Sequence, residues 1–450
     1  MLVAAIAGCA DHDRAPDAGV PTASAPARPP SPVTTLTVVA AGDLLVHEQL
    51  TAQAAADARA NGRPGHDFTE VLAAVAPVIS EADLAICHME QPLAEPEGPF
   101  TGYPLFSAPP QLADAAAAAG FDTCSTASNH SLDTGVEGVQ RTLDNLDRVG
   151  IAHAGTARTE REAATPTILD VRGVTVAHLS YTFSFNGIPL PDGKPWLANH
   201  LDPDAILAEA RRARAAGAEI VIASLHWGTE YQVAADSGQI GLARQLLAAD
   251  EIDLIIGHHA HVVQPFEKIG DKWVAYGLGN LITRFPDGSP EHTQDSVVPR
   301  FTFTRAGDGT WTVTDVAVVA AFMEYRPAAR VVNLPVALAD PDLDPQRRER
   351  YTRALERITG YVDQRGATAA GLRMATGAAA GGTDQLREPL GRSPRTGPAP
   401  SAAPESDDPG AAPALPDVLE RLPHRETGQP RAVAVDEFAH RGRVDAGVLP

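Results

Sequence analysis

Short apolar runs alternate with amphipathic stretches along the chain from Val33 onward. The apolar runs have the length and composition of buried strands, and the stretches between them carry helical periodicity. The clearest runs lie at 36–41, 82–87, 121–125, 174–180, 219–225 and 252–257. Later runs separated by Gly-containing turns, at 262–269, 273–277, 300–305 and 311–319, predict antiparallel strands. This order is typical of an α/β protein.

The α/β pattern accounts for only part of the 450 residues. Residues 33–365 are predicted to form one domain that closes with a helix at 345–361. Residues 10–32 and 366–450 are rich in Pro, Ala and Ser, and they predict a disordered linker and a largely disordered tail. No chemistry is assigned to the tail.

The first nine residues are apolar and end in Ile6-Ala7-Gly8-Cys9. This ending resembles the lipobox of bacterial lipoproteins, in which the cysteine, here Cys9, is lipidated. The stretch lacks a positively charged start and is short for a complete signal. We therefore expect a truncated signal on an extracytoplasmic protein that meets the membrane by a lipid anchor only. A frayed N-terminus with a chance cysteine is the alternative.

Charge and cysteine content exclude several classes of protein. Lys and Arg number 36 against 57 Asp and Glu, which gives a net charge of −21 and argues against nucleic acid as a partner. Beyond the N-terminus no run approaches the roughly 18 apolar residues of a membrane helix. The three cysteines, Cys9, Cys87 and Cys124, predict no disulfide framework and no cysteine zinc module. Cys87 and Cys124 are expected to be small buried hydrophobic residues.

Five polar segments follow apolar strands and carry residue types that bind metals. They are Gly42–His47, Cys87–Glu90, Ser128–Asp133, Leu225–Glu230 and Gly257–His261. Ligands of α/β sheets bind at the carboxyl ends of strands, so one crevice can collect all five segments. Carboxylate, imidazole and amide groups suit hard or borderline divalent cations.

These segments, in this order, resemble those of the CapA family of capsule or poly-γ-glutamate synthesis proteins, within the calcineurin-like metallophosphatase superfamily. The resemblance covers Val38 to Leu281. It rests on AAGDLLVH, CHMEQPL, ASNHSLDTGVEGVQRTLDNLDRVGIAHAGT, SLHWGTEY, GHHAHVVQPFE and YGLGNLI. It implies a sandwich of two mixed sheets flanked by helices, with two divalent ions (Mn, Zn, Fe or Mg) held along one edge.

The resemblance also implies roles for single residues. The expected metal ligands are Asp43, His47 and His261 for one ion, Glu90 in the bridging position, and Asn129, His226 and His259 for the other. His130 would stabilise the transferring group or protonate its leaving oxygen. The supporting or uncertain residues are His88, Asp133, Glu230, His258 and Asn280. His259 and His261 are preferred over His258 because strand residues two apart share a face.

Two positions depart from the family pattern. His88 stands where family members commonly have Asn, and it is open whether it is an extra ligand, a supporting donor or a harmless replacement. Glu90 stands where phosphatases usually have Asp, and its longer side chain leaves the spacing and number of ions open.

Two functions fit these observations. The first is a dimetal hydrolase or transferase of envelope polymer metabolism, acting on poly-γ-glutamate, another anionic envelope polymer or a phosphorylated small molecule. A pair of ions would supply a hydroxide near neutral pH and stabilise the attacking and leaving oxygens. The second is a non-catalytic accessory that binds or exports an anionic polymer with membrane synthase subunits. A 5′-nucleotidase-like phosphatase is a third interpretation, but such enzymes usually add a substrate domain that this tail does not resemble.

Overall fold

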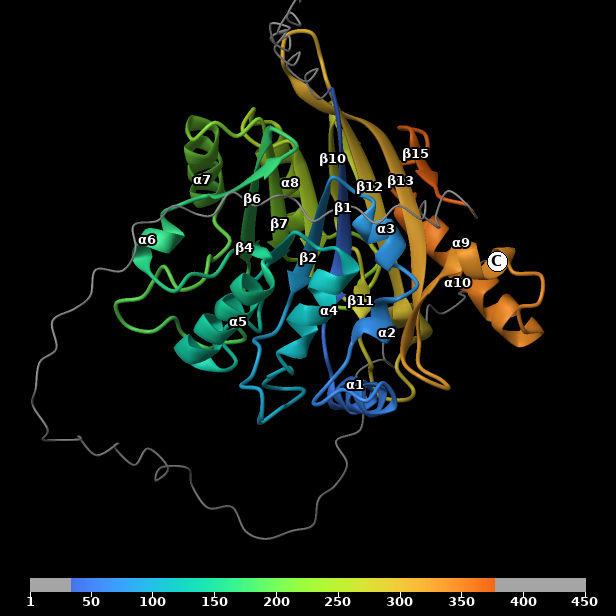
Figure 1. Ribbon diagram of the computed structural model, residues 1–450. Helices are drawn as coiled ribbons and strands as arrows, with labels where there is room; N and C mark the ends of the chain where they lie inside the picture. Colours follow the sequence, from blue (N-terminus) through green and yellow to red (C-terminus); the bar gives the residue numbers. More distant parts are fainter. Residues whose placement is uncertain (1–33, 377–450) are drawn as a thin grey trace, which may run out of the picture. The chain divides into compact units, whose positions relative to one another are not determined.

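Figure 1 shows the computed structural model of the chain, in which residues 34–376 are described. A first sheet of nine strands mixes parallel and antiparallel pairs. In spatial order its strands are β14 (Arg330–Asn333), β13 (Trp311–Glu324), β12 (Asp295–Arg305), β1 (Thr35–Leu44), β2 (Leu84–Met89), β3 (Thr123–Ser125) and β4 (Ala152–Ala154), with β11 (Asn280–Ile282) beside β1 and β15 (Leu372–Met374) beside β13. Strands β1 to β4 run parallel, so their carboxyl ends share one edge.

A second sheet of six strands is also mixed. Its order is β5 (Thr167–Val171), β6 (Val174–Thr182), β7 (Ile220–His226), β8 (Leu254–His258), β10 (Lys272–Ala275) and β9 (Phe266–Ile269). One hydrophobic cluster joins β1 and β2 of the first sheet to β6, β7 and β8 of the second, so the sheets pack face to face. The expected α/β sandwich of two mixed sheets flanked by helices is confirmed.

Helices cover the outer faces of both sheets (Figure 1). Those that pack against the first sheet and its edge are α1 (Glu48–Ala60), α2 (Thr69–Leu72), α3 (Ala76–Ser80), α4 (Gln111–Ala119) and α5 (Gly135–Val149). Helices α7 (Pro203–Ala215) and α8 (Ser237–Leu247) cover the second sheet. The remaining helices are α6 (Glu160–Ala163), α9 (Leu334–Ala339) and α10 (Pro345–Val362).

Most predicted elements are present, with one helix differing. The amphipathic stretch 68–79, whose pattern predicts one helix, instead forms two, α2 and α3, because Pro77 has no N–H to continue a helix through this point. Helix α10 confirms the closing helix expected at 345–361. Strand β15 lies beyond the boundary expected at residue 365 and pairs with β13, so the sheet includes part of the expected tail. No helix within 34–376 is long and apolar enough to cross a membrane.

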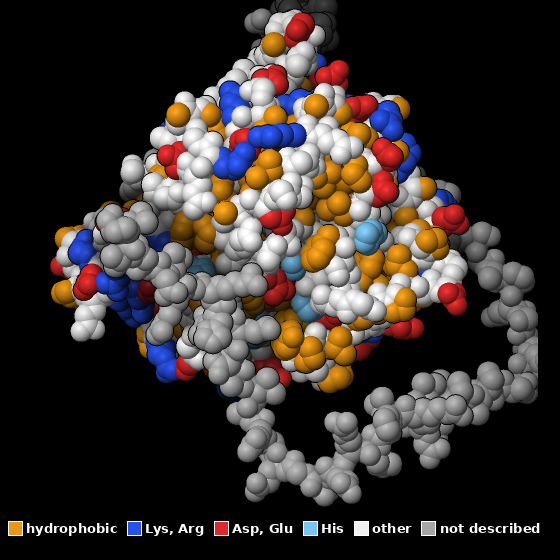
Figure 2. All heavy atoms as spheres, turned by 180° about the vertical axis from the view of Figure 1, so that it is seen from behind, with side chains coloured by type: hydrophobic (Ala, Val, Ile, Leu, Met, Phe, Trp, Pro, Cys, Tyr) orange, Lys and Arg blue, Asp and Glu red, His pale blue; other side chains and the backbone are white. Residues whose placement is uncertain are grey.

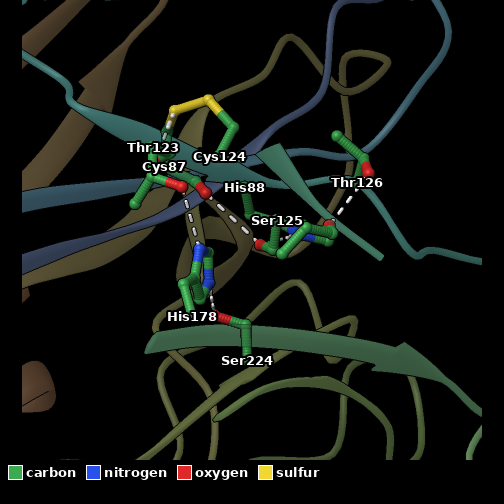
Figure 3. The surroundings of a disulfide bond; sticks show 9 residues. Cys87, His88, Thr123, Cys124, Ser125, Thr126, His178 and Ser224 are labelled. Carbon is green, nitrogen blue, oxygen red and sulfur yellow. Dashed lines mark hydrogen bonds between the residues drawn. A yellow bond between two sulfur atoms is a disulfide. The ribbon is translucent and has the colours of Figure 1, made fainter. Parts of the chain in front are cut away.

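A disulfide joins Cys87 of β2 to Cys124 of β3 (Figure 3). The two residues are direct partners in the parallel register, and their Cα atoms are 4.4 Å apart. The expectation of two separate buried thiols was therefore wrong. Their separation of 37 residues gave no sign of contact, because the pairing depends on the register of two strands that the sequence does not fix.

Candidate metal centre

Asp43 lies near the carboxyl end of β1, where the strand approaches another piece of backbone closely. A Cβ on the preceding Gly42 would stand 2.0 Å from the carbonyl oxygen of Gly279, so only glycine fits there. The buried Asp43 carboxylate faces the second sheet. One oxygen lies 2.9 Å from Nδ1 of His258, and the other accepts the backbone N–H of His259 at 3.2 Å.

Glu90 directly follows β2 and is fully buried. Both carboxylate oxygens lack a hydrogen-bond partner, and the nearest ion-pair partner is Nε2 of His261 at 3.7 Å. Ser128 fixes the backbone here by donating from its Oγ to the carbonyl of Glu90. Burial raises the pKa of Glu90 well above its usual value. An unpaired buried carboxylate is costly, so this position fits a bound cation.

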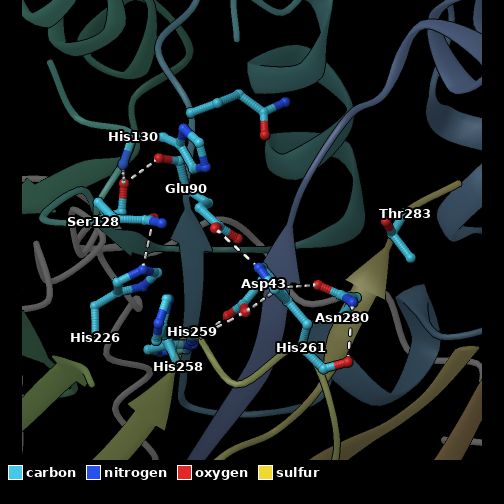
Figure 4. Close-up of polar contacts among 12 residues, drawn as sticks. Asp43, Glu90, Ser128, His130, His226, His258, His259, His261, Asn280 and Thr283 are labelled. Carbon is cyan, nitrogen blue, oxygen red and sulfur yellow. Dashed lines mark hydrogen bonds and ion pairs between the residues drawn. The ribbon is translucent and has the colours of Figure 1, made fainter. Parts of the chain in front are cut away.

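Three histidines at the end of β8 turn into the same space (Figure 4). His258 is the last residue of the strand, and His259 and His261 take left-handed backbone angles, with φ of 90° and 56°. The strand alternation that favoured His259 and His261 over His258 does not apply, because the chain leaves the strand after His258. His258 therefore reaches Asp43 as well.

His226 ends β7 and connects the two sheets. Its Nε2 lies 2.9 Å from Oδ1 of Asn129, and its Nδ1 lies 3.0 Å from Nε2 of His88. The other ring nitrogen of His88 lies 2.7 Å from Oγ of Ser125. Both nitrogens of His88 are thus engaged, and its ring stacks on His258 at 4.1 Å between centroids. This contact set favours His88 as a supporting residue that orients His226 and His258.

His130 also lies at the centre, and its ring is held by Asp133. Its Nδ1 is 2.7 Å from Oδ2 of Asp133, whose side chain is fully buried. The same Asp133 oxygen accepts the backbone N–H of Phe106, whose ring packs edge-on against His130. Because Nδ1 is engaged, Nε2 of His130 is the nitrogen left for a substrate.

Asn280 and His47 come to the centre by different routes. Asn280 starts β11, where it pairs with Asp43, and its Oδ1 lies 2.9 Å from Nδ1 of His261, so it orients that ring. His47 packs between the rings of Phe106 and Phe285, outside the three groups of potential ligands found in residues 34–376. Its ligand role stays a prediction.

Three overlapping groups of side chains place their ligand atoms within 4.8 Å of one another. They are Asp43 with His88 and His258, Asp43 with Glu90 and His261, and Glu230 with His259 and His261. Glu230 is exposed at the entrance, whereas the other members are buried. The residues present therefore fit divalent cations through carboxylate and imidazole ligands.

Burial and neighbouring charges act in opposite directions on the pKa values of this centre. Burial lowers the pKa of His259 to about 3 and that of His226 well below its usual value. Burial also lowers the pKa of His261, but the carboxylates of Glu90 and Asp43 outweigh it and raise that pKa to about 9. Burial raises the pKa of Asp43, yet hydrogen bonds from His258 and His261 bring it well below the usual value. Neutral imidazole is the form that binds metals.

Ser125 and Ser128 are the supporting residues that the sequence did not single out. Ser125 follows Cys124 in a three-residue strand, and Ser128 precedes the Asn129 and His130 pair. Only the contacts to His88 and to the Glu90 backbone reveal their positions. Cys9 lies outside the described residues.

Residues 37–284 match a family model described as bacterial capsule synthesis protein PGA_cap. The PGA biosynthesis protein CapA of Bacillus subtilis (strain 168) is 31% identical over 204 residues, which are 44% of this chain and 51% of that protein. The capsule biosynthesis protein CapA of Bacillus anthracis is 27% identical over 198 residues, 43% of this chain and 47% of that protein. A probable polyglutamine synthesis accessory protein of Mycobacterium tuberculosis (strain ATCC 25618 / H37Rv) is 28% identical over 176 residues, 35% of this chain and 44% of that protein. The chain spans about half the length of the curated relatives it matches.

Solved structures with a similar arrangement are distant in sequence. The calcineurin-like phosphoesterase YfkN from Bacillus subtilis is 16% identical, with a TM-score of 0.40, over 73% of this chain and 97% of that one. A 5′-nucleotidase described as putative, from Staphylococcus aureus, is 13% identical, with a TM-score of 0.41, over 72% of this chain and 58% of that one. With TM-scores this low, neither similarity carries a conclusion about the site.

Proposed function

The chain belongs to the bacterial capsule synthesis protein family PGA_cap, and on that basis we propose that it is a dimetal phosphoester hydrolase of capsular or other envelope polymer metabolism. One observation carries the proposal. Glu90 is fully buried beside Asp43 and His261, and neither of its oxygens has a hydrogen-bond partner. Such a group needs a cation to remain charged.

The chain's own residues divide the work of binding. Asp43, Glu90 and His261 would hold one ion, and Glu90 would share the second with Asn129, His226 and His259. Divalent ions in such a centre lower the pKa of water and stabilise charge on the transferring group. Asn280 and His88 hold the rings of His261 and His226 in place through hydrogen bonds.

His130 supplies the proton that the leaving oxygen requires. Asp133 accepts from Nδ1, which fixes the orientation of the ring. Nε2 then donates to the leaving group. Asp133 touches His130 but not the ligands of the centre, so its role is to position the ring.

The accessory role uses the same residues without turnover. It is favoured by the name of one relative, a probable polyglutamine synthesis accessory protein. In that case the centre would bind an anionic polymer through its ions, and membrane synthase subunits would be its partners.

Turnover with and without His130 separates the two roles. The purified full chain, loaded with manganese, zinc or magnesium, would be assayed on phosphoesters and on γ-linked glutamate polymer. We expect phosphoester turnover that falls at least about a hundredfold in His130→Ala, with metal content unchanged. His66→Ala, at a partly buried histidine outside the ligand groups, is the control. No turnover on any substrate, with saturable binding of the polymer, would establish the accessory role instead.

We also propose an extracytoplasmic, lipid-anchored location. The Cys87–Cys124 disulfide supports it, because disulfides persist in oxidising compartments. Labelling with a radioactive fatty acid tests the anchor, and we expect the protein to lose this label in Cys9→Ala. Label that persists in that variant would exclude lipidation at this cysteine.

A further inference from the structure

Exposed apolar side chains gather around the entrance of the metal centre. In residues 34–376 six large hydrophobic side chains are more than a third exposed, and these are Tyr103, Leu105, Ile168, Phe183, Tyr231 and Val336. Four of them, Tyr103, Leu105, Phe183 and Tyr231, lie on segments that border the centre, and we call these four the apolar rim. Large apolar side chains exposed together mark a binding surface more often than single scattered ones do.

Two members of the rim touch the candidate ligands directly. The ring of Phe183 lies 4.6 Å from that of His259, and the ring of Tyr231 lies 6.0 Å from that of His261, between centroids. Tyr231 has a left-handed backbone with φ of 62°, held by an N–H bond to the carbonyl of Ala260 at 2.8 Å. A bulky residue in this conformation is strained, and such strain is typical of functional sites.

The other two members lie on the segment that ends at Phe106. The ring of Phe106 packs against His47 and His130, which attaches this segment to the proton-donor side of the centre. The ring of Tyr231 lies 6.1 Å from that of Phe285, and Phe285 shares a small hydrophobic cluster with Phe106, so this segment and Tyr231 meet at the same side of the centre. The rim therefore borders the centre on more than one side.

The rim carries no cationic side chain of its own. Segments 43–53, 88–93, 100–107, 126–135, 181–190, 226–239 and 257–267 contain no Lys or Arg. Arg284 follows β11, but it is paired with Asp287 and lies over the ring of Tyr325. Figure 2 shows histidines surrounded by hydrophobic, acidic and uncharged atoms, with Lys and Arg mostly elsewhere on that face. Among these segments, a polyanion would find cations only at bound metals.

Phe183 also borders a pocket of about 440 Å³ next to the centre. Its other apolar wall residues are Leu201, Pro203, Trp227 and Leu242. Trp227 belongs to the hydrophobic cluster beneath α7 and α8, so the pocket lies on the helix side of the second sheet, and Phe183 is the wall residue that also contacts His259. It offers space for an apolar group of a few carbon atoms or a ring.

We propose that the substrate carries a single phosphoryl group on an apolar body, with the phosphoryl group at the metals and the body against Phe183 and Tyr231. This inference rests on the proposed hydrolase function and narrows its substrate. In the reaction, water adds to phosphorus and the bond from phosphorus to the leaving oxygen breaks. The leaving oxygen takes a proton, so an apolar alcohol and phosphate are released.

Binding of non-hydrolysable phosphonates tests the proposal without requiring turnover. The metal-loaded full chain would be titrated calorimetrically with methyl-, hexyl- and phenylphosphonate. We expect hexyl- or phenylphosphonate to bind at least about tenfold more tightly than methylphosphonate, because each buried methylene adds affinity. Whether hexyl- or phenylphosphonate binds more tightly shows whether the apolar body of the substrate is an alkyl chain or an aromatic ring.

Variants locate the apolar contact. In Phe183→Ala and Tyr231→Ala the preference over methylphosphonate should fall below about threefold, with methylphosphonate affinity kept. Ile168→Ala, an equally apolar exposed residue on β5, should leave the preference unchanged. Equal affinity for all three phosphonates, or tighter binding of γ-linked glutamate polymer, would overturn the proposal. Selective binding of hexylphosphonate without hydrolysis of hexyl phosphate would support the apolar rim but contradict the hydrolase function. Equal hydrolysis of methyl and hexyl phosphate would support the hydrolase function but contradict a role of the apolar rim in substrate selection.

Discussion

The two sheets contribute different chemistry to the same centre. The first sheet supplies the candidate oxygen ligands, Asp43, Glu90 and Asn129, from the loops after or the ends of β1, β2 and β3. The second sheet supplies the candidate imidazole ligands, His226, His259 and His261, at or after the ends of β7 and β8. The proposed centre therefore combines the two ligand types across the sheets.

Burial shifts the pKa values of the carboxylates of the first sheet and of the imidazoles of the second sheet in opposite directions. The pKa of Glu90 is raised well above its usual value by burial, and the pKa values of His226 and His259 are lowered by it. Both changes favour neutral groups. His261, with its pKa raised to about 9, lies across the sheets 3.7 Å from Glu90 and 3.5 Å from Asp43. We therefore expect a bound ion to displace the proton of His261.

The largest expected effect comes from removing the disulfide between β2 and β3 of the first sheet. Replacing both Cys87 and Cys124 by Ala removes the bond that joins β2 to β3, and closing a loop of 37 residues contributes about 3–4 kcal/mol in the chain-entropy account. We expect urea unfolding to show a loss of that size in the free energy of unfolding. Cys9→Ala should show none. A double variant as stable as the parent chain would show that the disulfide is unimportant for the first sheet.

Removing the unpaired carboxylate should nearly abolish binding of the ions. Glu90→Gln keeps the size of the side chain but cannot supply a charged oxygen to two ions, so we expect affinity for manganese to fall more than about a hundredfold. The metal-free protein should be as stable as the parent or more so, since a buried carboxylate is replaced. Calorimetric titration and thermal unfolding measure the two effects. The exposed Glu97→Gln is the control, and retained affinity in Glu90→Gln would exclude this residue as a ligand.

The sequence predicted that Asp43, Glu90, His226 and His261 come together, because they follow apolar strands and the carboxyl ends of parallel strands converge whatever the exact register. Their roles as ligands stay predictions. The contact of His258 with Asp43 could not be predicted, because the left-handed turns at His259 and His261 have no signature in residue type. Backbone geometry of this kind is imposed by the neighbouring chain, which local sequence does not contain.

Contacts between neighbouring strands of the first sheet were the least predictable part. Strand β11 has three residues and brings Asn280 beside Asp43, and its short length gave no periodicity to recognise. The Cys87–Cys124 bond and the Ser125–His88 contact both depend on the register of β2 against β3. A shift by one residue would break both, and the sequence of β3 alone does not choose the register.

Acidity should weaken metal binding through the proton on His261. Its pKa of about 9 means that the ring is protonated at neutral pH, and an ion must displace that proton. We expect affinity for manganese to rise about tenfold per pH unit for each proton released, between pH 6 and 8, and to level off above pH 9. Titration in two buffers of different ionisation enthalpy counts the protons. Affinity that is flat between pH 6 and 8 would contradict the protonated His261.

The smallest effect concerns two histidines that span the sheets in the same manner. His88 joins Ser125 to His226, and His178 joins Thr123 to Ser224, all at 2.7 to 3.0 Å. Both are fully buried, but only His88 touches candidate ligands. His88→Asn should therefore lower manganese affinity about tenfold, the lower end for a residue that orients ligands, and His178→Asn should leave it within about twofold. Because both variants lose one link between the sheets, a comparable loss of thermal stability in each would show that any difference in metal affinity comes from the contacts to His226 and His258. Equal affinities in the two variants would mean that His88 does no more than hold the sheets together.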